Sequence, residues 1–128
     1  MAIQTLAVLP RPFTIYAMDP DAVIPAQVLA SDLFFIGRTP DQLSIILPDT
    51  IPLAAQEQDN DWRALELLGS LELSMVGIMA KIGEVLAATK VSIFVLSTFD
   101  TDFFLVKNNK LDTAVNALQR AGYTVVNQ

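Results

Sequence analysis

Hydrophobic and polar positions alternate most regularly in the second half of the chain, from Trp62 to Val126. Short apolar runs rich in β-branched and aromatic residues indicate strands, and recurrence at every third or fourth position indicates helices. In chain order the predicted elements span residues 62–68 (strand), 73–88 (helix), 91–98 and 103–106 (strands), 108–121 (helix) and 123–126 (strand). The order β-α-β-β-α-β predicts a ferredoxin-like unit of the α+β class.

Each predicted helix carries one apolar stripe. The stripes consist of Met75, Met79, Ile82 and Leu86 in the first helix and of Leu111, Val115 and Leu118 in the second. Asn108 or Asn109 is a suitable N-cap for the second helix, and Gly122 is suited to end it in a left-handed conformation. Both helices are therefore expected to pack one face on the sheet.

The first half of the chain is less regular. Strands are predicted at residues 3–8, 13–18, 33–38 and 42–47, with one short helix at residues 25–30 and no second helix. The proline-containing segment after the last of these strands is expected to be irregular, and the polar residues 56–61 are the expected linker. The chain is thus predicted to contain an abbreviated N-terminal module, residues 1–60, and a C-terminal module, residues 61–128. The strand at residues 3–8 is expected to fill the vacant position in the first module.

The predicted strand at residues 91–98 lies at a sheet edge in a β-α-β-β-α-β unit. Its residues Val91–Leu96 are largely apolar on both faces and include no lysine or proline. An exposed edge of this kind promotes aggregation unless it is paired or covered. We therefore expect either one continuous sheet through both modules or a dimer formed through this edge.

Composition excludes several functions. The 128 residues are 52% hydrophobic and carry a net charge of −6, and this acidic balance disfavours nucleic acids and anionic membranes as partners. No apolar run is long enough to span a membrane, and Met1–Pro10 lacks the pattern of a signal peptide. The absence of cysteine and histidine removes thiolate chemistry and the commonest general base and zinc ligands. A cytoplasmic, non-enzymatic protein without a cofactor is favoured.

Several segments together are similar to one known family. They are Gly69–Ile78 (GSLELSMVGI), Val91–Phe103 (VSIFVLSTFDTDF), Asp19–Ala22, Phe34–Thr39 and Trp62–Leu65. Together they resemble tandem ACT proteins, a group that includes the cytosolic arginine sensors and many small bacterial proteins. The resemblance covers nearly the whole chain, and Val91–Phe103 is its most specific part. It implies two ACT-type modules side by side, the first of them abbreviated.

The resemblance also implies an amino-acid ligand held between adjacent modules. In such proteins the turn before the first helix of the second module contacts the carboxylate and the amine of the ligand. By position, the ligand-binding residues would be Ser70, Leu71, Glu72, Ser74, Val76, Gly77, Ser97, Thr98, Asp100 and Asp102. Glu72 stands where the family is expected to have aspartate, and Lys90 where it has a small turn residue. Both departures bear on the identity of the ligand.

The same residues have simpler interpretations. Ser70 or Ser74 would cap the helix, and Gly77 would allow close packing on the sheet. Asp100 and Asp102 would form a solvated turn, or together hold a hard cation such as Mg²⁺ or Ca²⁺. Asp102 is the better candidate for binding an ammonium group, because it begins a strand and can point inward.

Four further residues are candidates for ligand binding, and each also has a simpler structural interpretation. Asp19 and Asp21, which flank a proline, are candidates to face the ligand from the first module, with turn formation as the simpler interpretation. Arg38 is a candidate carboxylate clamp, with a surface role as the simpler interpretation. Trp62 is a candidate stacking platform, with core packing as the simpler interpretation.

These observations leave three functions. The first is a regulatory module that binds an amino acid or similar zwitterion and acts as a homodimer or through a protein partner. The second is a ligand-free module for dimerisation or protein interaction. The third, an enzyme using Asp100 and Asp102, is disfavoured because the sequence offers no recognisable pair of base and nucleophile. No metal site is expected.

Overall fold

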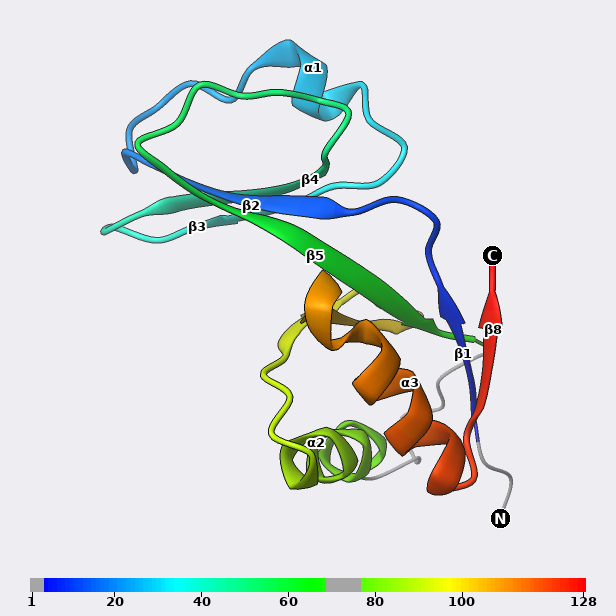
Figure 1. The fold of residues 1–128 in the computed structure, drawn as a ribbon. Helices are drawn as coiled ribbons and strands as arrows, with labels where there is room; N and C mark the ends of the chain where they lie inside the picture. Colours follow the sequence, from blue (N-terminus) through cyan, green and yellow to red (C-terminus); the bar gives the residue numbers. More distant parts are fainter. Residues whose placement is uncertain (1–3, 69–76) are drawn as a thin grey trace. The chain divides into compact units, whose positions relative to one another are not determined.

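The computed structural model describes residues 4–68 and 77–128, which form two compact units (Figure 1). Unit 1 contains residues 1–10 and 63–128, and unit 2 contains residues 11–62. The elements are β1 (Thr5–Val8), β2 (Phe13–Met18), α1 (Ala26–Leu29), β3 (Phe35–Arg38), β4 (Leu43–Pro48), β5 (Glu57–Leu67), α2 (Ile78–Ala88), β6 (Phe94–Ser97), β7 (Asp102–Lys107), a 3₁₀ turn (Asn108–Lys110), α3 (Leu111–Arg120) and β8 (Thr124–Asn127).

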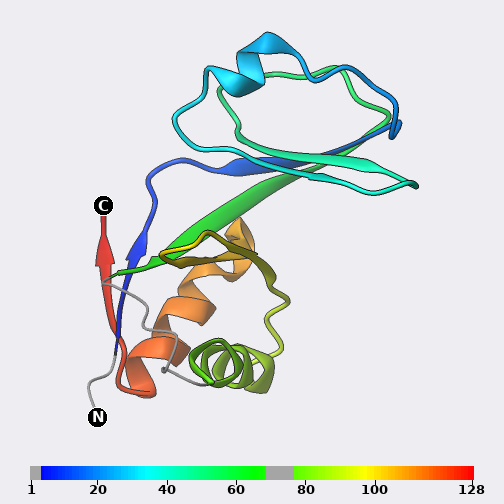
Figure 2. The same ribbon diagram turned by 180° about the vertical axis from the view of Figure 1, so that it is seen from behind.

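Unit 1 has the strand order β6-β7-β5-β1-β8. The chain order β5-α2-β6-β7-α3-β8 confirms the element order predicted for this half. Both α2 and α3 lie on one face of these strands (Figures 1 and 2). The class is therefore α+β, with the plan of a ferredoxin-like unit to which β1 is added.

The core of unit 1 lies between the strands and these two helices. Every second strand position faces the helices, and each helix contributes residues four positions apart, as the two periodicities require. The buried cluster comprises Leu6, Val8, Leu65, Leu67, Ile82, Leu86, Val91, Phe104, Val106, Ala114 and Leu118. The predicted stripe of α3 is confirmed, since Leu111 and Val115 also pack against this cluster. The predicted role of Met79 is wrong, because its side chain is 41% exposed.

The two ends of α3 differ in how well the sequence predicts them. The predicted cap at Asn108 or Asn109 is wrong, because both residues lie in the 3₁₀ turn and no side chain caps α3. Asn108 instead accepts a hydrogen bond from Arg63 through its Oδ1, at 3.2 Å. Gly122 follows the helix with φ of 100°, which confirms the predicted left-handed stop.

The N-terminal strand corrects the predicted division of the chain. The sequence assigns residues 3–8 to the first module, but β1 lies in unit 1, antiparallel to β5 and parallel to β8. Leu6 pairs with Leu67 on one side and with Val125 on the other, and its side chain is fully buried. Alternation shows which face of a strand is apolar but not which strand is its neighbour. The sequence pattern therefore could not place β1.

Unit 2 has the strand order β3-β4-β2-β5, with every neighbouring pair antiparallel. Its core cluster comprises Tyr16, Val28, Leu43, Ile45, Leu47 and Leu53. The helix α1 has only four residues. It lies with the connection from β4 to β5 on the same side of the strands (Figures 1 and 2). The predicted single short helix is confirmed, and residues 49–56 of that connection contain no helix.

The polar segment at residues 56–61 is not a linker, as the sequence suggested. Glu57, Gln58 and Asp59 belong to β5 and pair with Ala17, Tyr16 and Ile15 of β2. All side chains at residues 57–61 are exposed, while the backbone forms the ladder. Polar side chains are compatible with a strand whose faces contact solvent, because main-chain groups make the pairing bonds. The strand β5 thus pairs with β2 in unit 2 and continues into unit 1.

The sequence predicted an edge position for the strand at residues 91–98. The observed strand, β6, is shorter, and the predicted edge position is confirmed. Among the strands described here, β6 pairs with β7 alone. Phe94, Val95 and Leu96 are half-buried.

The helices within residues 4–68 and 77–128 are too short to cross a membrane.

Candidate functional site

The candidate ligand residues at the start of the second module fall into two groups. Ser70, Leu71, Glu72, Ser74 and Val76 lie outside the described residues, as does the predicted helix start at Leu73. Gly77 directly precedes α2 and has φ of 83° and ψ of 6°. Among the described residues, a Cβ atom at this position would meet nothing within 4 Å, so packing against them does not explain the glycine. Its left-handed backbone does, because residues with a side chain rarely adopt that conformation.

The other candidates lie where β6 turns into β7. Ser97 and Asp102 are opposite each other in the ladder, and the Ser97 Oγ donates a hydrogen bond of 2.6 Å to Oδ1 of Asp102. Asp102 is only 7% exposed, so the carboxylate is held in a fixed position at the end of the strand. The structure therefore brings together two of the predicted residues in a pair that could bind a cationic group.

The turn between these strands is held by its own threonines. The Thr98 amide donates to the Thr101 carbonyl at 2.8 Å, and the Thr101 amide donates to the Thr98 hydroxyl at 3.2 Å. The Thr101 hydroxyl in turn donates to the Leu67 carbonyl. Asp100 lies at the exposed tip of this turn and Asp102 at its buried base. The two carboxylates thus differ in environment, although they are two residues apart.

The remaining candidates have structural partners. The Asp19 Oδ1 accepts from the Asp21 amide at 2.9 Å, as in a local turn. The Arg38 guanidinium donates to the Ala22 carbonyl at 3.0 Å, and Trp62 is buried in β5. No group of three or more carboxylates that could hold a metal ion occurs within residues 4–68 and 77–128.

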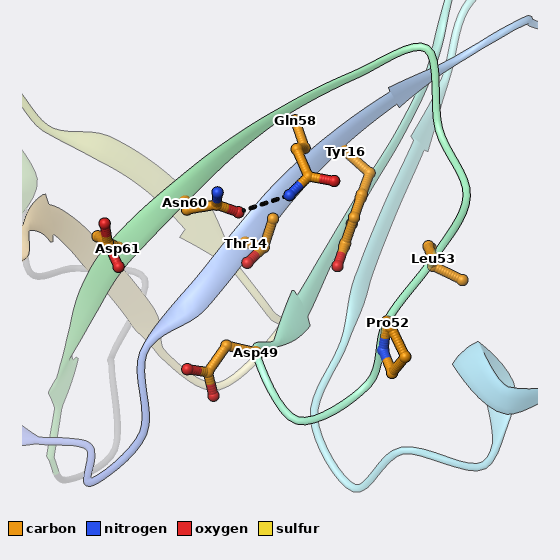
Figure 3. Close-up of a pocket in the computed structure, with 8 residues that line it drawn as sticks. All are labelled: Thr14, Tyr16, Asp49, Pro52, Leu53, Gln58, Asn60 and Asp61. Atoms are coloured by element: carbon orange, nitrogen blue, oxygen red, sulfur yellow. Dashed lines mark hydrogen bonds between the residues drawn. The ribbon is translucent and has the colours of Figure 1, made fainter.

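Unit 2 contains a cavity that the sequence did not predict (Figure 3). Its volume is about 330 Å³, and it is lined by Thr14, Tyr16, Asp49, Pro52, Leu53, Gln58, Asn60 and Asp61. These residues come from β2, from β5 and from the irregular connection between β4 and β5. In the sequence, the one sign of this cavity was that no second helix was predicted for the first half of the chain. A second helix would be expected to cover the same strands.

The polar side chains of this cavity are partly fixed by one another. The Tyr16 hydroxyl donates to the Ile51 carbonyl at 3.4 Å, and Gln58 Nε2 donates to Asn60 Oδ1 at 3.0 Å. Gln58 is paired with Tyr16 across the β2–β5 ladder, so both side chains lie on one face. Thr14 is 3% exposed, whereas Asp49 and Asp61 are exposed at the rim.

A comparison with family models decides the identity of the fold. The model of the ACT domain matches residues 57–120, which is half of the chain. The chain belongs to the ACT domain family. The match begins with β5 and ends with α3, so it includes the turn that carries Ser97 and Asp102.

Several solved structures share the fold of this chain. The ACT-domain chain is 28% identical to protein Atu0741 from Agrobacterium tumefaciens, with a TM-score of 0.89 over 100% of this chain and 96% of that one. It is 15% identical to the ligand-free regulatory subunit of aspartate kinase from Thermus thermophilus, with a TM-score of 0.68 over 94% of this chain and 99% of that one.

A third structure is a larger enzyme. Aspartate kinase from Clostridium acetobutylicum is 14% identical, with a TM-score of 0.69 over 91% of this chain and 34% of that one. At these identities the two kinase structures show a shared fold. None of the curated proteins compared with the chain matches it significantly.

Proposed function

We propose that this ACT-domain chain is a regulatory protein that binds an amino acid or a similar small zwitterion. The observation that carries the proposal is the buried Asp102 carboxylate, which Ser97 holds in place within the segment that matches the ACT domain. A fixed, largely desolvated carboxylate attracts an ammonium group more strongly than an exposed one does. The regulatory role is supported by the likeness to a protein named as the regulatory subunit of aspartate kinase.

The ligand would be bound, as the tandem ACT resemblance implies, where ACT modules meet. Ser70, Leu71, Glu72, Ser74, Val76 and Gly77 would contact it at the start of α2, where backbone amides favour a carboxylate. Ser97, Thr98, Asp100 and Asp102 would contact it from the β6–β7 turn, where Asp102 would accept from its ammonium. Together they would recognise both charges of a zwitterion.

Unit 2 is, in this proposal, the abbreviated ACT module. Its strand order has the first and third strands at the centre and the second at the edge, as in unit 1. One short helix replaces the two helices of a complete module. The protein would act in the cytoplasm, without enzymatic activity of its own, as a homodimer or through a protein partner whose packing changes when the ligand binds.

The test is a thermal-shift screen of the purified chain against the twenty amino acids. We expect one of them to raise the melting temperature in a saturable way, since a ligand at a hundredfold excess over its Kd stabilises a protein by about 2.7 kcal/mol. Asp102→Asn should abolish the shift. Asp41→Asn is the matched control, because Asp41 is an exposed aspartate in a turn of unit 2. An equal response in both variants would refute the role of Asp102.

A second candidate function is a ligand-free dimerisation module. It is favoured by β6, whose half-buried apolar side chains lie on a strand that pairs only with β7 within the described residues. In that case the melting temperature would depend on protein concentration and would not respond to any amino acid.

A further inference from the structure

We propose that the cavity of unit 2 binds a small organic cation that carries both an ammonium group and a hydroxyl group. This site is separate from the amino-acid site proposed for unit 1. Its lining residues all belong to residues 11–62, whereas the amino-acid site uses residues 70–77 and 97–102.

The cavity exists because unit 2 lacks a second helix. In unit 1, α3 connects the third and fourth strands and packs Ala114 and Leu118 on the sheet. In unit 2 the equivalent connection, residues 49–56, has no helix, and Pro52 and Leu53 are its contribution to the lining. Beside the core residues Tyr16 and Leu53, the face of β2 and β5 beneath it therefore carries the polar side chains of Thr14, Gln58 and Asn60 (Figure 3).

Thr14 shows that this cavity is built for a polar occupant. Its side chain lies on the cavity side of β2 (Figure 3), and the residue is only 3% exposed. Across residues 4–68 and 77–128 its hydroxyl group makes no hydrogen bond. The hydroxyl is thus open to the cavity, where it can donate a hydrogen bond to a ligand or accept one from it.

The lining offers several hydrogen-bond acceptors. The Tyr16 hydroxyl uses its proton on the Ile51 carbonyl, which leaves its oxygen as an acceptor. Gln58 uses one N–H of its side-chain amide on Asn60, which leaves its carbonyl oxygen as an acceptor and its second N–H as a donor for a ligand hydroxyl. The ionised carboxylates of Asp49 and Asp61 can only accept. A ligand that donates several hydrogen bonds, as an ammonium group does, matches this lining.

The charged side chains of the lining favour one class of ligand. The lining includes the carboxylates of Asp49 and Asp61 but no lysine or arginine. Both carboxylates are at the exposed rim, where they attract a cation and repel a carboxylate. A zwitterionic amino acid would place its own carboxylate near them without a compensating cation. The geometry therefore favours an amine that has no carboxylate.

The size of the cavity and the shape of β5 agree with a small ligand. The volume of about 330 Å³ lies at the lower end of the range of roughly 300–1,000 Å³ for ligand pockets. The register of β5 against β2 shifts between Phe13 and Ile15, and Asp61 has φ of 67°. A bulge of this kind redirects side chains, and here it occurs beside the two residues that β5 contributes to the rim, Asn60 and Asp61.

The test is an NMR titration of the full chain with ethanolamine, followed through backbone amide shifts. We expect saturable shifts at residues 14–16 and 58–61, and none at residues 97–102. Ethylene glycol, which has a hydroxyl in place of the ammonium group, and glycine, which has a carboxylate in place of the hydroxymethyl group, should each bind at least about tenfold more weakly. Shifts that are equal for ethanolamine and ethylene glycol would overturn the proposal.

Variants locate the binding groups. Asp49→Asn and Asp61→Asn should each weaken ethanolamine binding about tenfold, and asparagine tolerates the left-handed backbone at residue 61. Thr14→Val should weaken it as well, whereas Thr14→Ser should retain it, which separates a lost hydroxyl from a misfolded variant. Asp41→Asn, outside the cavity, should change the Kd less than twofold.

Three results would contradict this inference. They are an absence of shifts at residues 14–16 and 58–61, an unchanged Kd in the combined Asp49→Asn and Asp61→Asn variant, and displacement of ethanolamine by Ca²⁺ at equal concentration. The last would make the cavity a cation site with no selectivity for amines. A failure of the amino-acid screen leaves all three readouts intact, because they report on unit 2.

Discussion

Units 1 and 2 arrange their strands in the same way but cover them differently. In unit 1, two helices of ten and eleven residues bury Phe104 and Leu118 completely. In unit 2, a helix of four residues and an irregular connection leave a cavity of about 330 Å³ beside Tyr16. The comparison teaches that strand order defines the module, whereas the covering segments determine whether a sheet face becomes core or binding surface.

The largest expected effect is in the core of unit 1. Phe104→Ala should lower the free energy of unfolding by about 3–5 kcal/mol, because it removes a fully buried aromatic ring and leaves a void. Chemical denaturation measures this loss. The matched control is Phe99→Ala, which should change stability by less than about 0.5 kcal/mol, since Phe99 is 93% exposed. Similar losses in both variants would contradict the assigned core.

A pair of leucines tests the difference between the units directly. Leu118→Ala in α3 should cost about 3 kcal/mol, because the residue is fully buried between helix and sheet. Leu53→Ala should cost less, about 2 kcal/mol, because Leu53 belongs to the core of unit 2 but also lines a cavity that is already open. Denaturation curves of the two variants give the comparison, and equal costs would show that unit 2 is as tightly packed as unit 1.

The Ser97–Asp102 hydrogen bond should have a smaller effect on stability. Ser97→Ala should cost about 1–2 kcal/mol, because the buried carboxylate loses a donor at 2.6 Å. A double-mutant cycle with Asp102→Asn isolates the interaction energy. A coupling energy near zero would mean that Ser97 does not hold Asp102 in place.

The smallest effects are expected at two residues with left-handed backbones, one in each unit. Asp61 has φ of 67° and Lys90 has φ of 61°. Replacement of either by glycine should raise stability by about 0.5–1 kcal/mol, because glycine adopts this conformation without steric cost. Asp61→Gly should at the same time weaken ethanolamine binding, whereas Lys90→Gly should not. Thermal unfolding and the NMR titration measure the two effects separately.

The sequence predicted the helices and most strands because their side chains carry the periodicity. The bounds of β2, β4, β7 and β8 were predicted to within one residue. Residues 57–61 were mistaken for a linker because their strand pairing uses backbone groups, while their exposed side chains are polar. The neighbours of β1 could not be predicted, because apolar alternation in Thr5–Val8 fits several positions in a sheet.

The candidate site was predictable only in part. Ser97 and Asp102 were both identified, but their hydrogen bond depends on a ladder register that a turn of unknown length leaves open. The cavity of unit 2 was missed because its residues are far apart in sequence and include Thr14, Asp49 and Asp61. No local motif connects them, and only the fold brings their side chains to one place.

The position of β1 imposes an order of events during synthesis. Thr5 leaves the ribosome well before its partner in β8, Thr124. Residues 11–62 can form their sheet while the rest of the chain is still being made. Unit 1 cannot complete its sheet until β8 has been synthesised, and until then β1 is unpaired on one side. The newly made chain therefore carries an unpaired apolar strand edge until β8 has been synthesised.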